Sequence, residues 1–262
     1  MIKKILLMAA AIIISISAQA RLTAHRGEVA NGYNYWLSEP EISVDSEADA
    51  KPVVIFLHGA SLCGNDLNRV KRYGTIDAIE KGRTLDAYVI APQNPGGAWN
   101  PHKVMNVLDH VSKNANIDPN RIYVLGMSLG GYGTIDLAAT YPDRIAAAIA
   151  MCGGGSVKDL SGLSKVPLWI IHGTADRAVN VSQSDRVVNL IRSINDERLS
   201  YSRIPGMNHG QPARMFYLKE SYDWLFSHSL NDRNRTLHET FTVTQERLRS
   251  AYRDLRTSRR RT

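Results

Sequence analysis

Short apolar runs alternate with longer amphipathic segments along most of this 262-residue chain. Segments of helical length separate the runs, which is the pattern of a parallel sheet covered by helices on both faces. Polar–apolar alternation between residues 27 and 45 predicts antiparallel strands ahead of the parallel ones. The chain is therefore expected to form an α/β fold with a mostly parallel sheet. Its predicted strands are 53–57, 87–91, 122–126, 146–151, 167–171 and 199–204, and its predicted helices are 102–114, 130–141, 182–194 and 213–228.

The first twenty residues have the pattern of a secretory signal peptide. Lys3 and Lys4 supply positive charge, residues 5–16 are apolar, and Ala18-Gln19-Ala20 places small residues at the cleavage position. The alternative is a membrane anchor, but the apolar stretch is shorter than the roughly 20 residues that a spanning helix needs. We expect cleavage near Ala20 and a secreted or periplasmic protein, with residues 21–230 forming one domain.

The net charge of +7 is concentrated at the two ends of the chain. Residues 1–20 contain two Lys, and residues 231–262 contain nine Arg against four Asp or Glu, so residues 21–230 have a net charge of zero. This distribution argues against nucleic-acid binding by the main domain. The basic segment 231–262 is expected to be a solvated tail or a loosely docked helix. The functional alternative for this segment is weak contact with an anionic surface.

Gly126-Met127-Ser128-Leu129-Gly130 follows a predicted strand and opens a predicted helix. This spacing is typical of a nucleophile elbow, a turn so tight that only residues without a Cβ fit at its two flanking positions. The turn pushes the side chain of Ser128 into solvent. Ser128 is therefore the candidate nucleophile.

A base and an acid follow in the chain order that such a serine requires. Asp176 comes directly after one predicted strand, and His209 comes directly after the next. Parallel strands end at one edge of the sheet, so His209 is expected to contact Ser128 with one ring nitrogen and Asp176 with the other. The competing acids are less suitable, because Asp143 precedes its strand and Asp185 lies within a helix. Ser128, Asp176 and His209 are the expected catalytic triad.

Two backbone N–H groups are expected to stabilise a developing oxyanion. Leu129 directly follows the candidate nucleophile, and Ala60 lies in a loop that follows the first parallel strand. Ser61 is the less favoured second donor and a candidate substrate contact. Trp99 ends a glycine-rich loop after another strand, where it either forms a wall of the substrate cleft or packs as an aromatic, and we favour the cleft wall.

The sequence predicts neither a metal nor a cofactor. His102 and His110 share a predicted helix, but no third ligand lies near them at metal-binding spacing. His58 and His172 begin His-Gly turns at strand ends and are expected to brace loops through hydrogen bonds.

The two cysteines, Cys63 and Cys152, follow different strands. Secretion would permit a disulfide between them. The favoured interpretation makes Cys152 a small buried apolar residue instead.

Five blocks of this sequence resemble the secreted esterase, phospholipase and predicted-peptidase branch of the α/β-hydrolase superfamily. The blocks are 56–60, 91–93, 117–133, 152–155 and 172–176, within a similarity that covers residues 50–228. The resemblance implies a serine hydrolase related to feruloyl esterases, acetyl xylan esterases and similar carboxylesterases, working through an acyl-enzyme without a cofactor. Leu129 stands where many relatives carry Met, and a backbone donor is unaffected by this difference.

Only 15 residues separate the strand ending at Met151 from the strand starting at Pro167, where many lipases of the superfamily insert a lid or cap domain. So short a segment predicts an open cleft, which suits small or carbohydrate-linked acyl groups. Two alternatives stay open: a serine peptidase of the same fold, and a non-catalytic protein that binds a glycan or a surface. The acyl group, the alcohol and the oligomeric state are not defined by the sequence.

Overall fold

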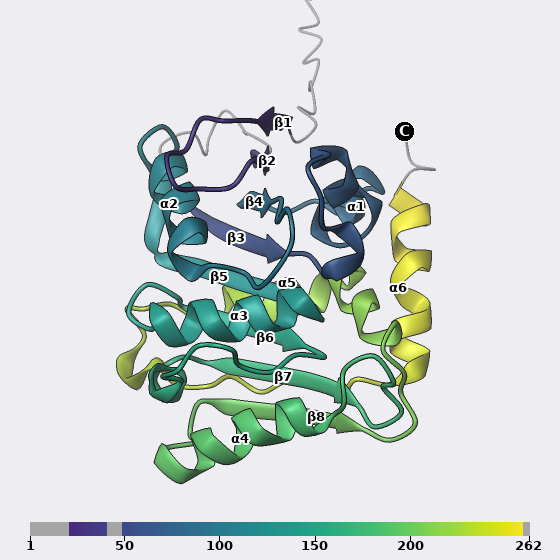
Figure 1. Ribbon diagram of the computed structural model, residues 1–262. Coiled ribbons are helices and arrows are strands. Elements are labelled where there is room, and N and C mark those ends of the chain that lie inside the picture. Colours follow the sequence, from purple (N-terminus) through teal and green to yellow (C-terminus); the bar gives the residue numbers. More distant parts are fainter. Residues whose placement is uncertain (1–20, 41–48, 259–262) are drawn as a thin grey trace, which may run out of the picture.

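The computed structural model describes residues 21–40 and 49–258 (Figure 1). Its eight strands form one sheet in the order β1-β2-β4-β3-β5-β6-β7-β8. β2 is antiparallel to both of its neighbours, whereas β3 to β8 run parallel to one another. The strands are β1 (Leu22–His25), β2 (Tyr35–Ser38), β3 (Lys51–Leu57), β4 (Tyr88–Pro92), β5 (Ile117–Met127), β6 (Ala147–Met151), β7 (Leu168–Gly173) and β8 (Leu199–Ile204).

Helices cover both faces of this sheet, because successive strand residues point to opposite faces. On one face, Val53, Ile55 and Leu57 of β3 pack in a core with α2, α3 and α4. On the other face, Val54 and Phe56 pack in a second core with α1, α5 and α6. The helices are α1 (Thr75–Glu80), α2 (Pro101–Ser112), α3 (Leu129–Thr140), α4 (Ser182–Ile194), α5 (Lys219–Phe226) and α6 (Gln245–Ser258), with short 3-10 helices η1 (Ala60–Leu62), η2 (Leu67–Arg72), η3 (Ser161–Lys165), η4 (Gln211–Tyr217) and η5 (Arg233–Arg235).

The predicted architecture is confirmed: a mostly parallel α/β sheet with helices on both faces and no cap domain. Each predicted parallel strand overlaps an observed one, and β1 and β2 are the antiparallel pair expected ahead of them. Between β6 and β7 the chain forms only the short helix η3. The predicted helix 213–228 is divided into η4 and α5 at Leu218, whose backbone is extended (φ −80°, ψ 128°). Helices α1 and η2 were not predicted.

Residues 231–258, the described part of the segment expected to be a solvated tail or a loosely docked helix, contribute buried residues to the core. Leu248, Ala251 and Leu255 of α6 are buried in the core cluster that also contains η4. The ring of Tyr252 packs on Tyr217 of η4 with centroids 4.6 Å apart. In Figure 1, α6 stands at the side of the sheet toward which the parallel strands point. The apolar stripe of α6 is therefore buried within the molecule.

The expected signal peptide, residues 1–20, lies outside the described residues, together with its cleavage site. The same holds for Arg259, Arg260 and Arg261 at the other end. In the ranges that the structure does describe, no helix combines the length and the apolar composition needed to cross a bilayer.

Candidate active site

Ser128 occupies a strained turn between β5 and α3. Its backbone has φ 59° and ψ −123°, a region that non-glycine residues rarely adopt. A Cβ added to Gly130 would lie 1.8 Å from the carbonyl oxygen of Leu57, and one added to Gly126 would lie 2.3 Å from the carbonyl oxygen of Gly130. The two glycines are needed because backbone crosses backbone at this turn, as expected for a nucleophile elbow.

Asp176 and His209 form a hydrogen-bonded pair at the ends of β7 and β8. Nδ1 of His209 lies 2.7 Å from Oδ2 of Asp176. The amides of Ala178 and Val179 each donate to Oδ1 of Asp176 at 2.9 Å. Burial by itself would raise the pKa of Asp176, but these hydrogen bonds outweigh burial and hold that pKa below its usual value. Asp176 is therefore ionised at neutral pH and fixes the orientation of the His209 ring.

The loops that carry this acid and this base are tied to each other. The amide of Ala175 donates to the carbonyl of Met207 at 3.0 Å, and the amide of Gly206 donates to Oγ1 of Thr174 at 3.0 Å. A Cβ on Gly173 would lie 2.1 Å from the carbonyl oxygen of Met207. Because these contacts fix the two loops relative to each other, the Asp176–His209 pair is organised before any substrate binds.

Residues at the end of β6 link Ser128 to this pair. Its amide donates to the carbonyl of Met151 at 2.8 Å, and the thiol of the next residue, Cys152, lies 3.9 Å from the carbonyl oxygen of His209. Within residues 21–40 and 49–258, no hydrogen bond joins Ser128 directly to His209. Nucleophile–base contacts are often long in unliganded hydrolases and shorten when substrate binds.

The loop after β3 lies beside Ser128 and is held rigidly. A Cβ on Gly59 would lie 3.4 Å from Cβ of Ser128. The amide of Gly59 is already used, since it donates to the hydroxyl of Tyr73 at 2.8 Å. Ala60 begins η1 and Leu129 begins α3, and N–H groups in the first turn of a helix have no acceptor within that helix. These are the two predicted oxyanion donors, and Ser61 lies exposed in the same helix η1.

Trp99 does not line the cleft, contrary to our expectation. Its side chain is only 4% exposed and lies against Gly133 of α3. Its Nε1 donates to the carbonyl of His58 at 3.2 Å, and the two rings meet edge to face. Trp99 therefore packs against the loop after β3, which is the alternative role that we considered for it.

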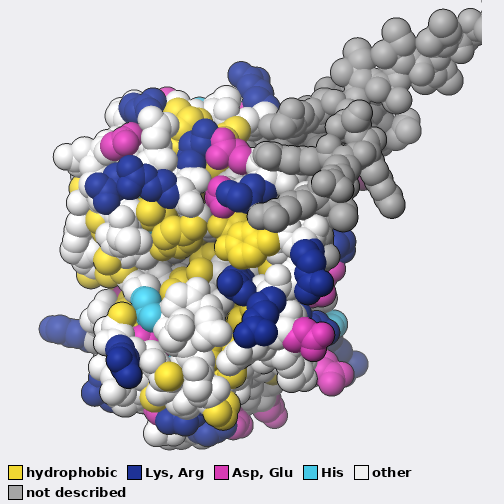
Figure 2. Space-filling model, turned by 90° about the vertical axis from the view of Figure 1, so that its right-hand side faces the viewer, with side chains coloured by type: hydrophobic (Ala, Val, Ile, Leu, Met, Phe, Trp, Pro, Cys, Tyr) yellow, Lys and Arg dark blue, Asp and Glu magenta, His cyan; other side chains and the backbone are white. Residues whose placement is uncertain are grey.

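An open depression of about 700 Å³ adjoins the acid–base pair. Figure 2 shows the face at the strand ends, where apolar side chains form a band bordered mainly by Lys and Arg. The depression is open to solvent. Its lining residues are Ala175, Arg177, Ala178, Gly206, Asn208, His209 and Gly210.

Both cysteines are free thiols, so they do not form a disulfide. Cys152 is fully buried, and burial raises the pKa of its thiol, with the nearby Asp176 carboxylate acting in the same direction. Cys152, His172 and Asp176 place potential ligand atoms within 4.8 Å of one another. His172 contacts Oδ2 of Asp176 directly at 3.2 Å, so hydrogen bonding accounts for this cluster. The sequence pattern did not show that His172 reaches the candidate acid.

Residues 98–222 match the Phospholipase/Carboxylesterase family. The chain is 30% identical over 175 residues to poly(3-hydroxyalkanoate) depolymerase C of Paucimonas lemoignei, covering 59% of this chain and 40% of that protein. It is 34% identical over 89 residues to a probable acetylxylan esterase A of Aspergillus flavus, covering 34% of this chain and 29% of that protein. The chain thus spans less than half the length of these curated relatives.

Solved structures show the same fold. A thermostable esterase superimposes with a TM-score of 0.63 at 27% identity, over 80% of this chain and 63% of that one. The feruloyl esterase module of Clostridium thermocellum superimposes with a TM-score of 0.61 at 14% identity, over 86% and 92% of the two chains.

With its sheet order, elbow and acid–base loops, the chain has the fold of the α/β-hydrolase superfamily. Within that superfamily, its similarity is to the branch of carboxylesterases, to which the matched family and the esterase relatives belong.

Proposed function

We propose that this protein is a secreted serine hydrolase that cleaves carboxylic esters through Ser128, His209 and Asp176. One observation carries the proposal: a serine in a strained elbow lies at the sheet edge where a buried carboxylate already orients a histidine. Strain and preorganisation of this kind cost stability and are typical of catalytic sites. The pattern of residues 1–20 supports secretion.

The reaction begins when Oγ of Ser128 attacks the ester carbonyl carbon while Nε2 of His209 takes the serine proton. The negative charge moves to the carbonyl oxygen, where the N–H groups of Ala60 and Leu129 bind it. The C–O bond to the alcohol then breaks, and His209 gives its proton to the departing oxygen. Water, deprotonated by His209, attacks the acyl-Ser128 ester and releases the acid. Asp176 remains ionised and stabilises the imidazolium in both halves of the reaction.

The proposed substrates are esters with small or carbohydrate-linked acyl groups. The absence of a cap between β6 and β7 supports this choice, because nothing encloses a long buried acyl chain. The open depression beside His209 admits polymer-linked esters. The name of one relative, a probable acetylxylan esterase, supports carbohydrate-linked acetyl groups, and the name of another, a poly(3-hydroxyalkanoate) depolymerase, supports polymeric esters.

Hydrolysis of p-nitrophenyl acetate by residues 21–262 tests the proposal. We expect Ser128→Ala to lower kcat by about 10⁶-fold, as is typical for loss of a triad serine. A fluorophosphonate should modify the unaltered protein at Ser128 in a 1:1 ratio. Ser193→Ala, which changes a serine on α4 away from the site, is the matched control and should retain full activity.

Equal rates for the unaltered protein and Ser128→Ala would reject the triad. Faster turnover of aminoacyl anilides than of acetyl esters would identify a peptidase of the same fold. No turnover of either substrate, together with binding of xylan oligosaccharides, would identify a non-catalytic binding protein.

A further inference from the structure

His172 is a fully buried histidine at the end of β7 that the triad does not include. Its Nε2 lies 2.9 Å from the carbonyl oxygen of Val179 and 3.2 Å from Oδ2 of Asp176. Its Nδ1 lies 2.8 Å from Oγ of Ser184, which in turn lies 2.7 Å from the carbonyl oxygen of Gly153. One ring therefore connects β7, the loop of the acid, the start of α4 and the segment after β6.

The partners of His172 determine where its proton lies. Nε2 faces two oxygens that only accept hydrogen bonds, since Asp176 is ionised and Val179 contributes a carbonyl. A lone pair on Nε2 would repel both oxygens, so the proton belongs on Nε2. Burial lowers the pKa of His172 more than these contacts raise it, so the ring is neutral. Nδ1 lies 2.8 Å from Oγ of Ser184, whose single hydroxyl proton is donated to the carbonyl of Gly153.

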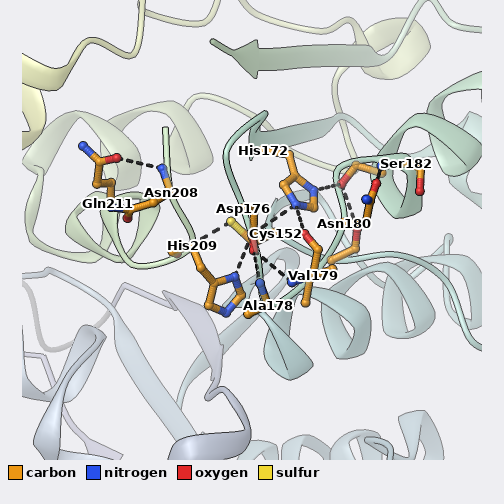
Figure 3. A network of polar contacts seen from close by, with 12 residues as sticks. Cys152, His172, Asp176, Ala178, Val179, Asn180, Ser182, Asn208, His209 and Gln211 are labelled. Atoms are coloured by element: carbon orange, nitrogen blue, oxygen red, sulfur yellow. Dashed lines mark hydrogen bonds and ion pairs between the residues drawn. The ribbon is translucent and has the colours of Figure 1, made fainter. Parts of the chain in front are cut away.

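Three hydrogen bonds from N–H groups and one further contact surround the carboxylate of Asp176. Oδ1 accepts from the amides of Ala178 and Val179, and Oδ2 accepts from Nδ1 of His209. Nε2 of His172, whose shorter contact at 2.9 Å is with the carbonyl oxygen of Val179, also faces Oδ2 at 3.2 Å. Figure 3 shows Asp176 between the two imidazole rings.

We propose that His172 is a positioning residue of the catalytic site, which holds Oδ2 of Asp176 in the direction that orients His209. Without the Nε2–H group, Oδ2 keeps one ring donor instead of two, and the carboxylate is free to turn about its last bond. The His209 ring would then lose its fixed direction toward Ser128. The kinetic part of this inference rests on the proposed function, and the structural part does not.

The other titratable groups around His172 do not replace its role. The thiol of Cys152, after β6, has its pKa raised by burial and then by Asp176, so it remains protonated at neutral pH. Asp185 on α4 also faces the ring, but its carboxylate accepts from the hydroxyl of Tyr201 at 2.6 Å and pairs with Arg203 at 3.1 Å. His172 and His209 each place a ring nitrogen within 3.2 Å of Oδ2 of Asp176, and the thiol of Cys152 also hydrogen-bonds to this carboxylate.

The test compares two substitutions at this position. His172→Phe keeps a ring of similar volume but has no donor, whereas His172→Gln keeps an N–H group near the position of Nε2. We expect His172→Phe to lower kcat on p-nitrophenyl acetate by about 10- to 100-fold, as for other supporting partners of site residues, with KM unchanged. His172→Gln should recover most of that loss. His102→Phe, a change at a histidine that contacts Tyr141 far from the triad acid, is the control.

A second readout does not depend on ester hydrolysis. The proton shared by His209 and Asp176 should give a low-field NMR signal, which can be followed in the Ser128→Ala background. We expect this signal to broaden or move upfield in His172→Phe and to return in His172→Gln. Thermal unfolding of each variant identifies any variant that is not folded. If His172→Phe does not fold, the test uses the NMR signal and kcat of His172→Gln.

Two outcomes would overturn the inference. One is a folded His172→Phe protein with unchanged kcat and an unchanged low-field signal. The other is a rise in KM at constant kcat, which would make His172 a substrate contact. If the unaltered protein hydrolyses no ester, the proposed function fails, while the NMR comparison still decides whether His172 orients Asp176 and His209.

Discussion

Gly130 has space for a hydrogen atom and for nothing larger. A Cβ there would lie 1.8 Å from a backbone oxygen of β3, and neither strand nor elbow can move without disturbing the sheet. We expect Gly130→Ala to destabilise the protein by about 3 kcal/mol or more, at or beyond the upper end of overpacking effects. Urea unfolding measures this loss. Gly210→Ala is the control, because its nearest neighbouring atom is 3.9 Å away; an equal loss in both proteins would contradict the steric argument.

Individual residues differ in how far the sequence reveals their role. Ser128, Asp176 and His209 follow strand ends in a fixed order, so local pattern was sufficient to propose them. Trp99 has a role set by partners distant in the sequence, His58 and Gly133, whereas His172 contacts Asp176 only four residues away, through a turn whose geometry the sequence does not give. No periodicity or motif contains that information, which is why the position of Trp99 was predicted wrongly.

At the scale of elements, the parallel strands β3 to β7 were predictable because their apolar runs are continuous and buried on both faces, whereas β8 is only half-buried. The firm docking of helix α6 was not predicted, because its many Arg residues hide a short stripe of three buried residues. Those residues, Leu248, Ala251 and Leu255, recur at spacings of three and four, which is the period of an amphipathic helix. Only the structure shows the core residues against which this stripe packs.

The buried stripe of α6 predicts a large cost for truncating Leu248. We expect Leu248→Ala to lower the free energy of unfolding by about 2–5 kcal/mol, the usual range for a buried leucine. Arg249→Ala changes an exposed neighbour on the same helix and should alter it by less than about 0.5 kcal/mol. Urea denaturation compares the two. Similar small effects in both would show that α6 contributes little to the core.

At the scale of the whole molecule, two buried histidines make stability depend on pH. Nε2 of His58 accepts from the amide of Asn94 at 3.0 Å, and Nε2 of His228 accepts from the amide of His238 at 3.1 Å. Protonation would remove both hydrogen bonds, and burial lowers the pKa of each histidine to about 4. Both rings are therefore neutral in the folded protein.

A lowered histidine pKa stabilises the fold above the unfolded pKa of about 6.5, and the stabilisation is lost as pH falls toward 4. In that window the unfolded chain binds protons that the folded protein does not. We expect the free energy of unfolding to fall between pH 6.5 and 4, by at most on the order of 3 kcal/mol for each histidine. Urea denaturation across this range measures the slope. His228→Gln should make it shallower, and an unchanged slope would exclude His228 as a contributor.

The docking of α6 also has a consequence for the order in which the protein matures. A ribosome makes all three proposed triad residues before it makes α6, yet η4, which directly follows the His209 loop, packs against that helix. A nascent chain that ends before residue 245 has all the proposed catalytic groups but lacks α6, the helix that packs on η4 behind the His209 loop. Hydrolytic competence would then arise only after α6 has closed over the core, so that a chain still lacking this helix has little capacity to act on esters inside the cell that makes it.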